Sequence, residues 1–169
     1  RAEEKGLDHL IEVITGDAGE VDLGNERYDA ALCLGASFVW GGLDGTLAAL
    51  IPSVRRRGYV AVGEVYWRTW PLPSNYEPAE GHVFRTLADT VGAIEATGLR
   101  PVSLIDASLA DWDRYESLHW ATLQDWLDAN PSDPDAERFR RMGDKYRDRY
   151  LRWDRDLMGW AIIVGQKAG

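Results

Sequence analysis

Residues 28–67, YDAALCLGASFVWGGLDGTLAALIPSVRRRGYVAVGEVYW, decide the fold of this chain. The stretch begins with an almost wholly apolar run over residues 29–34, which ends in a Gly-Ala-Ser turn. Apolar side chains then recur at helical spacing over residues 43–54, and a second apolar run covers residues 59–65. Continuous apolar strands on either side of an amphipathic helix predict a parallel sheet with both faces covered.

The ends of these two strands are the first place to look for a site. Parallel strands bring their carboxyl ends to one rim, and ligands of open parallel sheets bind just beyond it. Residues 35–40 follow the first strand, and residues 64–70 follow the second. We therefore expect these two segments to face each other across a functional site.

Composition limits the classes of partner. The chain has 169 residues, which is one domain by length, and its 19 basic and 28 acidic residues give a net charge of −9. This balance argues against nucleic acid, because phosphate binding needs clustered positive charge. No apolar run has the length of a membrane span, so we expect a cytoplasmic protein without a membrane partner. Cys33 is the sole cysteine and lies in an apolar strand, which indicates a buried structural thiol.

Shorter patterns complete the predicted elements. Residues 1–7 resemble the end of a helix, and three further strands are expected at residues 10–15, 100–106 and 159–166. Residues 68–82 contain prolines and polar residues, which predicts a mobile cover over the strand rim. Helices are expected over residues 86–97 and 111–129, and a third begins after a capping box at Ser132.

Two of these helices carry aromatic stripes. The stripe on residues 111–129 comprises Trp112, Tyr115, His119, Leu123 and Trp126. The next helix is expected to bury Phe139, Met142, Tyr146 and Tyr150.

The order of these motifs resembles that of the class I S-adenosylmethionine-dependent methyltransferases. IEVITGDA (11–18) resembles the third strand of that fold, YDAALCLGAS (28–37) its fourth strand and loop, and LAALIPSVRRRGYVAVGE (47–64) its glycine turn and fifth strand. LRPVSLID (99–106) and GWAIIVGQK (159–167) resemble the closing strands. The resemblance implies an α/β fold, a Rossmann-like three-layer methyltransferase sandwich with a mostly parallel sheet and an antiparallel last strand. It also implies a single domain over residues 1–169 with a helical insertion at about 109–156.

The first strand and the glycine-rich cofactor loop of that family are absent from this sequence. No Gly-x-Gly-x-Gly occurs, and the family's first strand would pair with the strand at residues 29–34. We therefore expect that strand to have an unpaired edge, which is costly and favours association. The hypothesis is an N-terminally incomplete methyltransferase domain, a fragment of a longer enzyme, with a gap-filling strand from another chain as the second option. The exposed edge also leaves a homo-oligomer open.

The resemblance implies S-adenosylmethionine as cofactor. Asp17 would accept the exocyclic amine of its adenine, and Ala18 would leave room for the flat ring; the alternative for Asp17 is a turn or cap acid. Leu34, Gly35 and Ala36 would form the floor under the methionine part of the cofactor, because a small residue lets backbone approach a ligand. For Gly35, the alternative is a glycine that only ends a strand.

The acceptor would lie on the same rim. Substrate contacts are expected from Trp40, Glu64, Tyr66, Trp67 and Tyr115. Aromatic residues at a strand end can equally be packing, whereas a charge that closes an apolar strand needs a partner. His119 is the candidate catalytic base, with a structural role as the alternative. No His, Cys, Asp or Glu grouping has metal-ligand spacing, so no metal is expected.

These features predict methyl transfer to an oxygen or nitrogen of a small-molecule acceptor. The alternative is a non-catalytic methyltransferase-like module that serves binding or dimerisation. A nucleotide-binding oxidoreductase is a weaker third option, because no dinucleotide fingerprint occurs.

Overall fold

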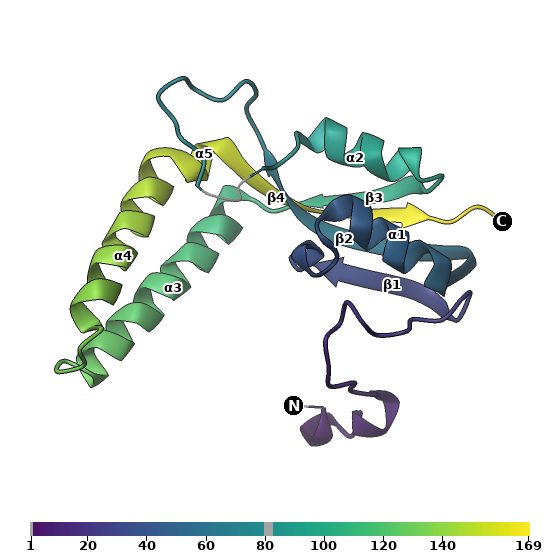
Figure 1. Cartoon of the computed structure of the whole chain (residues 1–169), viewed down its shortest axis with the longest axis horizontal. Helices are drawn as coiled ribbons and strands as arrows, with labels where there is room; N and C mark the ends of the chain where they lie inside the picture. Colours follow the sequence, from purple (N-terminus) through teal and green to yellow (C-terminus); the bar gives the residue numbers. More distant parts are fainter. Residues whose placement is uncertain (1, 80–82) are drawn as a thin grey trace.

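The computed structural model describes residues 2–79 and 83–169 (Figure 1). Within them, four strands form one open sheet in the order β1-β2-β4-β3. Strands β1 and β2 are parallel, and β4 runs antiparallel to both β2 and β3. The predicted Rossmann-like α/β fold, with a mostly parallel sheet and an antiparallel last strand, is confirmed; of the three predicted layers, the described residues form the sheet and one helical layer. The strands are β1 (Tyr28–Leu34), β2 (Val54–Trp67), β3 (Arg100–Asp106) and β4 (Met158–Gln166).

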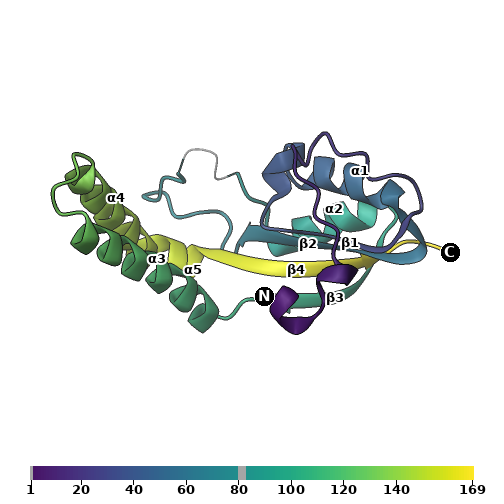
Figure 2. The same ribbon diagram turned by 90° about the horizontal axis from the view of Figure 1, so that it is seen from below.

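Two helices, α1 (Leu43–Ser53) and α2 (Leu87–Ala96), cover one face of this sheet (Figure 2). The side chains between them and the strands form the main core, in which Leu47 and Ile94 are fully buried. Cys33 of β1 lies in the same core, and burial raises the pKa of its thiol. It is therefore a buried thiol, as predicted.

The opposite face of the sheet and the outer edge of β1 are exposed in the described part of the chain. Leu32, Leu34 and Ile105 are 63%, 45% and 58% exposed, although all three belong to strands. β1 stands at the end of the strand order and, among the described residues, pairs with β2 alone. The unpaired edge expected from the sequence is thus confirmed.

The strand predicted at residues 10–15 does not form. Ile11, Val13 and Ile14 are 55%, 81% and 63% exposed, and these residues have extended or irregular backbone without sheet pairing. A strand needs a neighbour to receive its backbone hydrogen bonds, and no described segment supplies one. The helix end predicted before it is replaced by two short 3₁₀ turns, η1 (Glu3–Lys5) and η2 (Asp8–Leu10).

A helical hairpin separates β3 from β4 along the chain (Figure 1). A capping box between Ser108 and Asp111 starts its first helix. The capping box predicted at Ser132 is wrong: the second helix begins after Asp135, whose side chain makes no cap bond. The hairpin consists of α3 (Leu109–Ala129), α4 (Ala136–Arg149), the π-helical turn η4 (Tyr150–Asp154) and α5 (Arg155–Leu157).

The predicted buried stripe of α4 is only half correct. Tyr150 is buried and Phe139 packs edge-on against Trp126 of α3, with ring centroids 5.2 Å apart. Met142 and Tyr146 are 44% and 58% exposed. The reason is that α4 packs mainly on α3, so the buried side of the helix is narrow.

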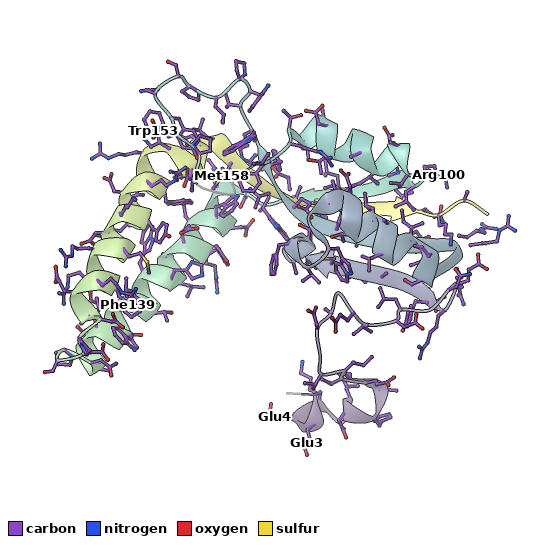
Figure 3. All side chains as sticks on the ribbon, in the orientation of Figure 1. Glu3, Glu4, Arg100, Phe139, Trp153 and Met158 are labelled. Carbon is purple, nitrogen blue, oxygen red and sulfur yellow. The ribbon has the colours of Figure 1, made fainter. Side chains whose placement is uncertain are left out.

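The segment between β2 and α2, which the sequence predicts to be a mobile cover, packs against the rest of the fold in its described part. Tyr76 is buried in a second cluster with Trp67 and Met158. Figure 3 shows Met158 and Trp153 where the hairpin joins the sheet, and the Tyr76 ring lies 5.8 Å from that of Trp153. The rest of the predicted cover, residues 80–82, lies outside the described residues. No helix in the described part of the chain combines the length and apolar composition that a membrane span requires.

Candidate active site

A pocket of about 700 Å³ opens beyond the carboxyl ends of β1 and β2. Its walls come from the β1–α1 loop, the start of α1, the end of β2 and the segment before α2. This is the rim that the sequence predicts. The lining residues are Gly35, Ser37, Phe38, Gly41, Gly42, Leu43, Asp44, Gly63, Glu64, Val65, Val83, Phe84, Arg85 and Thr90.

Gly35 turns the chain out of β1 into the pocket wall. Its φ of +70° lies in the left-handed region that favours glycine. Its N–H donates to the carbonyl of Gly63 at 3.0 Å, which extends the contact between β1 and β2 to the end of the strand. A short 3₁₀ turn, η3 (Ser37–Trp40), then leads into α1. Because the residue that follows β1 is a glycine, no side chain projects into the pocket at this position.

Glu64 is the carboxylate that closes β2. Ser37 Oγ donates a hydrogen bond to Glu64 Oε2 at 3.2 Å, whereas Glu64 Oε1 is buried and has no hydrogen-bond partner among the described residues. Burial raises the pKa of Glu64, and the Ser37 hydrogen bond and the positive charge of Arg85 oppose that shift. Within the described residues, one oxygen of this half-buried acid in the pocket wall is thus left without a hydrogen bond.

Asp44 and Arg85 form an ion pair at the pocket mouth. Arg85 Nη1 and Nη2 donate to Asp44 Oδ1 and Oδ2 at 3.0 and 2.7 Å, a two-pronged geometry. The hydrogen bond lowers the pKa of Asp44 and raises that of Arg85. The Arg85 backbone is fixed by the N–H of Trp67, which donates to the Arg85 carbonyl at 2.8 Å. The pair therefore links α1 to the end of β2.

The aromatic residues predicted on the rim pack in or against the two hydrophobic cores and are not part of the described lining of the pocket. Tyr66 is 4% exposed and donates its hydroxyl to Asp106 Oδ1 at 2.7 Å; burial and this bond raise the pKa of Tyr66 to about 12. Trp67 is 3% exposed, and its ring lies 5.1 Å from that of Phe84. Trp40 is half-buried against the main core.

The five residues predicted to contact the cofactor do not all lie at the pocket. Asp17 and Ala18 are exposed, and Asp17 Oδ1 accepts a hydrogen bond from the N–H of Gly19 at 2.8 Å. Leu34 is exposed at the end of β1, and Ala36 packs against the main core. Among these five positions, Gly35 alone belongs to the residues that line the pocket.

The predicted base lies elsewhere on the described chain. His119 and Tyr115 are exposed on α3, where their rings meet edge to face with centroids 4.5 Å apart. No residue of α3 belongs to the described lining of the pocket. The structure thus brings together Gly35 and Glu64, and it leaves His119 outside. In the described residues, no group of three His, Cys, Asp or Glu side chains could hold a metal ion.

Four lining residues with direct contacts in the site were not predicted from the sequence. Ser37 was part of a recognised turn, but nothing in the turn indicates its bond to Glu64. Asp44 and Arg85 are 41 residues apart, and a charge pair at that separation leaves no local pattern. Phe84 directly precedes Arg85, so the approach of this segment to β2 brings both into the pocket.

The chain was compared with known proteins. No protein-family model matches it. The uncharacterized protein YjhP of Escherichia coli (strain K12) is 35% identical in an alignment of 168 positions, which covers 97% of this chain and 67% of the relative. The X-ray structure of E. coli YjhP superposes with a TM-score of 0.86 at 33% identity, covering 99% of this chain and 69% of that one.

Two further solved structures are named as methyltransferases. The SAM-dependent methyltransferase from Geobacter sulfurreducens, in complex with S-adenosyl-L-homocysteine, has a TM-score of 0.85 and 32% identity. The SAM-dependent methyltransferase from Thiobacillus denitrificans, in complex with the same molecule, has a TM-score of 0.84 and 33% identity. Each match covers 97% of this chain and 67% of the other. The chain therefore belongs to the S-adenosylmethionine-dependent methyltransferase family.

Proposed function

We propose that the chain serves methyl transfer from S-adenosylmethionine to a nitrogen or oxygen atom of a small organic molecule. The observation that carries the proposal is the pocket at the carboxyl ends of β1 and β2, with the half-buried carboxylate of Glu64 in its wall. The two methyltransferase structures with bound S-adenosyl-L-homocysteine support the choice of cofactor. A pocket of about 700 Å³ suits a small molecule better than a macromolecule.

The cofactor side of the proposal rests on the end of β1. Bound S-adenosylmethionine supplies a methyl group on a positively charged sulfur. Leu34, Gly35 and Ala36 would lie under its methionine part, where the absence of a side chain at Gly35 leaves room. Asp17 and Ala18 are proposed at the adenine, and both are exposed and therefore open to a ligand. For such a transfer the protein mainly orients two reactants and excludes water.

The acceptor side rests on the end of β2. Phe38, Leu43 and Val65 provide apolar surface, and Glu64 provides the polar contact. Trp40, Tyr66 and Trp67 hold these elements in place from the core side. Tyr115 and His119 could reach an acceptor only if α3 moved toward the pocket, so a nearer group is the better candidate for proton transfer.

A second candidate function is a non-catalytic module that keeps the fold for binding or dimerisation. The exposed segment around Asp17 and the open edge of β1 favour it. Incubation with methyl-labelled S-adenosylmethionine and three acceptor pools (dialysable metabolites, protein and nucleic acid) separates the two. The proposal predicts label in the dialysable pool. Label in protein or nucleic acid would contradict a small-molecule acceptor, and absence of transfer despite cofactor binding would favour the module.

A further inference from the structure

Building on the proposed function, we propose that the pocket takes an acceptor that carries a protonated amine, and that Glu64 binds this ammonium group and receives its proton. Glu64 is then a catalytic residue, because it touches the reacting nitrogen of the substrate. The inference narrows the acceptor from any small nucleophile to an amine on a small apolar body.

The first support is the hydrogen bonding of Glu64. A buried carboxylate oxygen without a partner is unfavourable, and Glu64 Oε1 is such an atom in this structure. Ser37 Oγ holds the other oxygen at 3.2 Å. A ligand N–H at Oε1 would supply the missing hydrogen bond. The Ser37 hydrogen bond therefore holds one carboxylate oxygen, and within the described residues the other has no donor.

The second support is the charge of the pocket. The described lining contains three charged side chains, and two of them, Asp44 and Arg85, neutralise each other through two hydrogen bonds. Arg85 acts on Glu64 through its charge, but the described residues show no ion pair between the two, so the lining keeps a net charge of −1. A neutral hydroxyl would satisfy the hydrogen bond but not the charge, and an anionic acceptor would be repelled. An ammonium group satisfies both requirements.

The third support is the apolar wall. Phe38 is 78% exposed at the pocket, and Leu43, Val65 and Phe84 add further apolar surface. An exposed aromatic ring near a carboxylate favours a cation with a hydrocarbon body, because the ring face attracts positive charge. The pocket thus combines one anionic group with a surface for a small apolar scaffold.

The proposed step balances as follows. An N–H proton of the bound ammonium moves to the Glu64 carboxylate, which frees the nitrogen lone pair. The lone pair forms a bond to the methyl carbon, and the C–S bond breaks with its electron pair passing to sulfur. The products are a methylated ammonium and S-adenosylhomocysteine, and protonated Glu64 returns its proton to solvent.

Three probes with the same ring test the preference: benzylamine, benzyl alcohol and benzoate. Each is titrated into the ¹⁵N-labelled chain, with and without S-adenosylhomocysteine, and amide shifts of residues 37–44 and 64–65 are followed by NMR. We expect benzylamine to bind there at least about tenfold more tightly than benzoate, since an interaction with a charged partner is worth this much. Equal or tighter binding of benzoate or benzyl alcohol, or no binding of any probe, would overturn the proposal.

A matched pair of variants tests the residue itself. Glu64→Gln preserves the size of the side chain and is expected to lose the preference for benzylamine. Glu95→Gln makes the same change on the exposed side of α2 and should retain it. Unchanged preference in Glu64→Gln would contradict the role of Glu64. Cofactor binding is scored separately with S-adenosylhomocysteine alone. A failure of the proposed function therefore shows as lost cofactor binding, and a failure of this inference shows as lost amine selectivity.

Discussion

Ser37 Oγ donates a hydrogen bond of 3.2 Å to Glu64 Oε2 and so joins the loop after β1 to the end of β2. The bond holds one carboxylate oxygen, and Oε1 is buried without a partner in the part of the chain that the structure describes. Each strand ends at the same rim because β1 and β2 are parallel. The topology thus places in the pocket wall an acid whose hydrogen bonding the proposed amine would complete.

Replacing Glu64 should change stability in a pH-dependent way. Burial raises its pKa, so the charged form is disfavoured in the folded state. Protonated Glu64 therefore contributes to the free energy of unfolding. This contribution is fully present below the ordinary pKa of 4.5 and is lost as the pH rises through the raised pKa of the folded state. We expect Glu64→Gln to raise the Tm by about 1–2 °C at neutral pH, a small effect because solvent screens a half-buried group.

Thermal unfolding across a pH series checks this expectation. The difference between Glu64→Gln and the unchanged chain should shrink toward zero in acid. Among the described residues, the charged or titratable groups that act on Glu64 or share its pocket are Arg85, Asp44 and Cys33. Glu95→Gln serves as the exposed control and should show no such trend. A lower Tm for Glu64→Gln at neutral pH would show that the acid is satisfied by the fold.

The ion pair between Arg85 and Asp44 should contribute little to global stability. Their side chains are 39% and 73% exposed, so solvent screens the attraction. Arg85→Lys keeps the charge but loses the two-pronged hydrogen bonding, and we expect it to lower the free energy of unfolding by less than about 1 kcal/mol. Because the hydrogen bond from Arg85 lowers the pKa of Asp44, this contribution is present above pH 3.8 and is lost as the pH falls through the lowered value.

Urea unfolding of Arg85→Lys at neutral and acidic pH measures this effect. Arg140→Lys is a suitable control, because Arg140 forms a similar exposed pair with Glu137. A loss of several kcal/mol in Arg85→Lys alone would mean that the pair holds the segment before α2 in place.

A buried network at the base of the hairpin should matter far more. Tyr76 Oη donates to Asp154 Oδ1 at 2.7 Å and accepts from Arg149 Nη2 at 2.6 Å. Tyr76→Phe leaves both charged groups short of a partner, which should lower the free energy of unfolding by about 1–3 kcal/mol. Tyr146→Phe, at a position that is 58% exposed, should change it by less than about 0.5 kcal/mol. Equal effects of the two variants in chemical denaturation would contradict a structural role for the network.

The open edge of β1 should make the chain self-associate. Its unpaired backbone groups lie beside the exposed side chain of Leu32. Sedimentation velocity over a concentration series should show association, and Leu32→Lys should reduce it. Leu118→Lys removes a similarly exposed leucine from α3 and should not. Association that responds equally to both variants would mean that the edge of β1 is not the contact.

The elements that pack on neighbours within the chain could be predicted from sequence. β3 occupies residues 100–106 as expected, and α1 and α2 lie where helical spacing places them. Residues 10–15 have the composition of a strand, but composition cannot show whether a pairing partner is present. Met142 and Tyr146 show the same limit. Their spacing places them on one face of α4, but spacing cannot show whether another helix packs on that face.

Those parts of the site that follow from the order of the strands could also be predicted from the sequence. Gly35 and Glu64 follow adjacent parallel strands, so topology alone brings them to one rim. The contact between Asp44 and Arg85 depends on how the chain returns from Trp67 to α2, which no local pattern encodes. The spacing of His119 describes a face of α3, whereas its distance from the pocket depends on the direction of the whole hairpin.

Calorimetric titration of this chain with S-adenosylhomocysteine tests the central claim most directly. Two glycine variants accompany it: Gly35→Ala, which strains a φ of +70° at the floor of the pocket, and Gly92→Ala, which adds a methyl group at an open position on α2. We predict micromolar binding by the unchanged chain and by Gly92→Ala, with affinity about tenfold weaker or worse in Gly35→Ala. No binding by the unchanged chain, or equal binding by all three, would contradict a cofactor site at the end of β1.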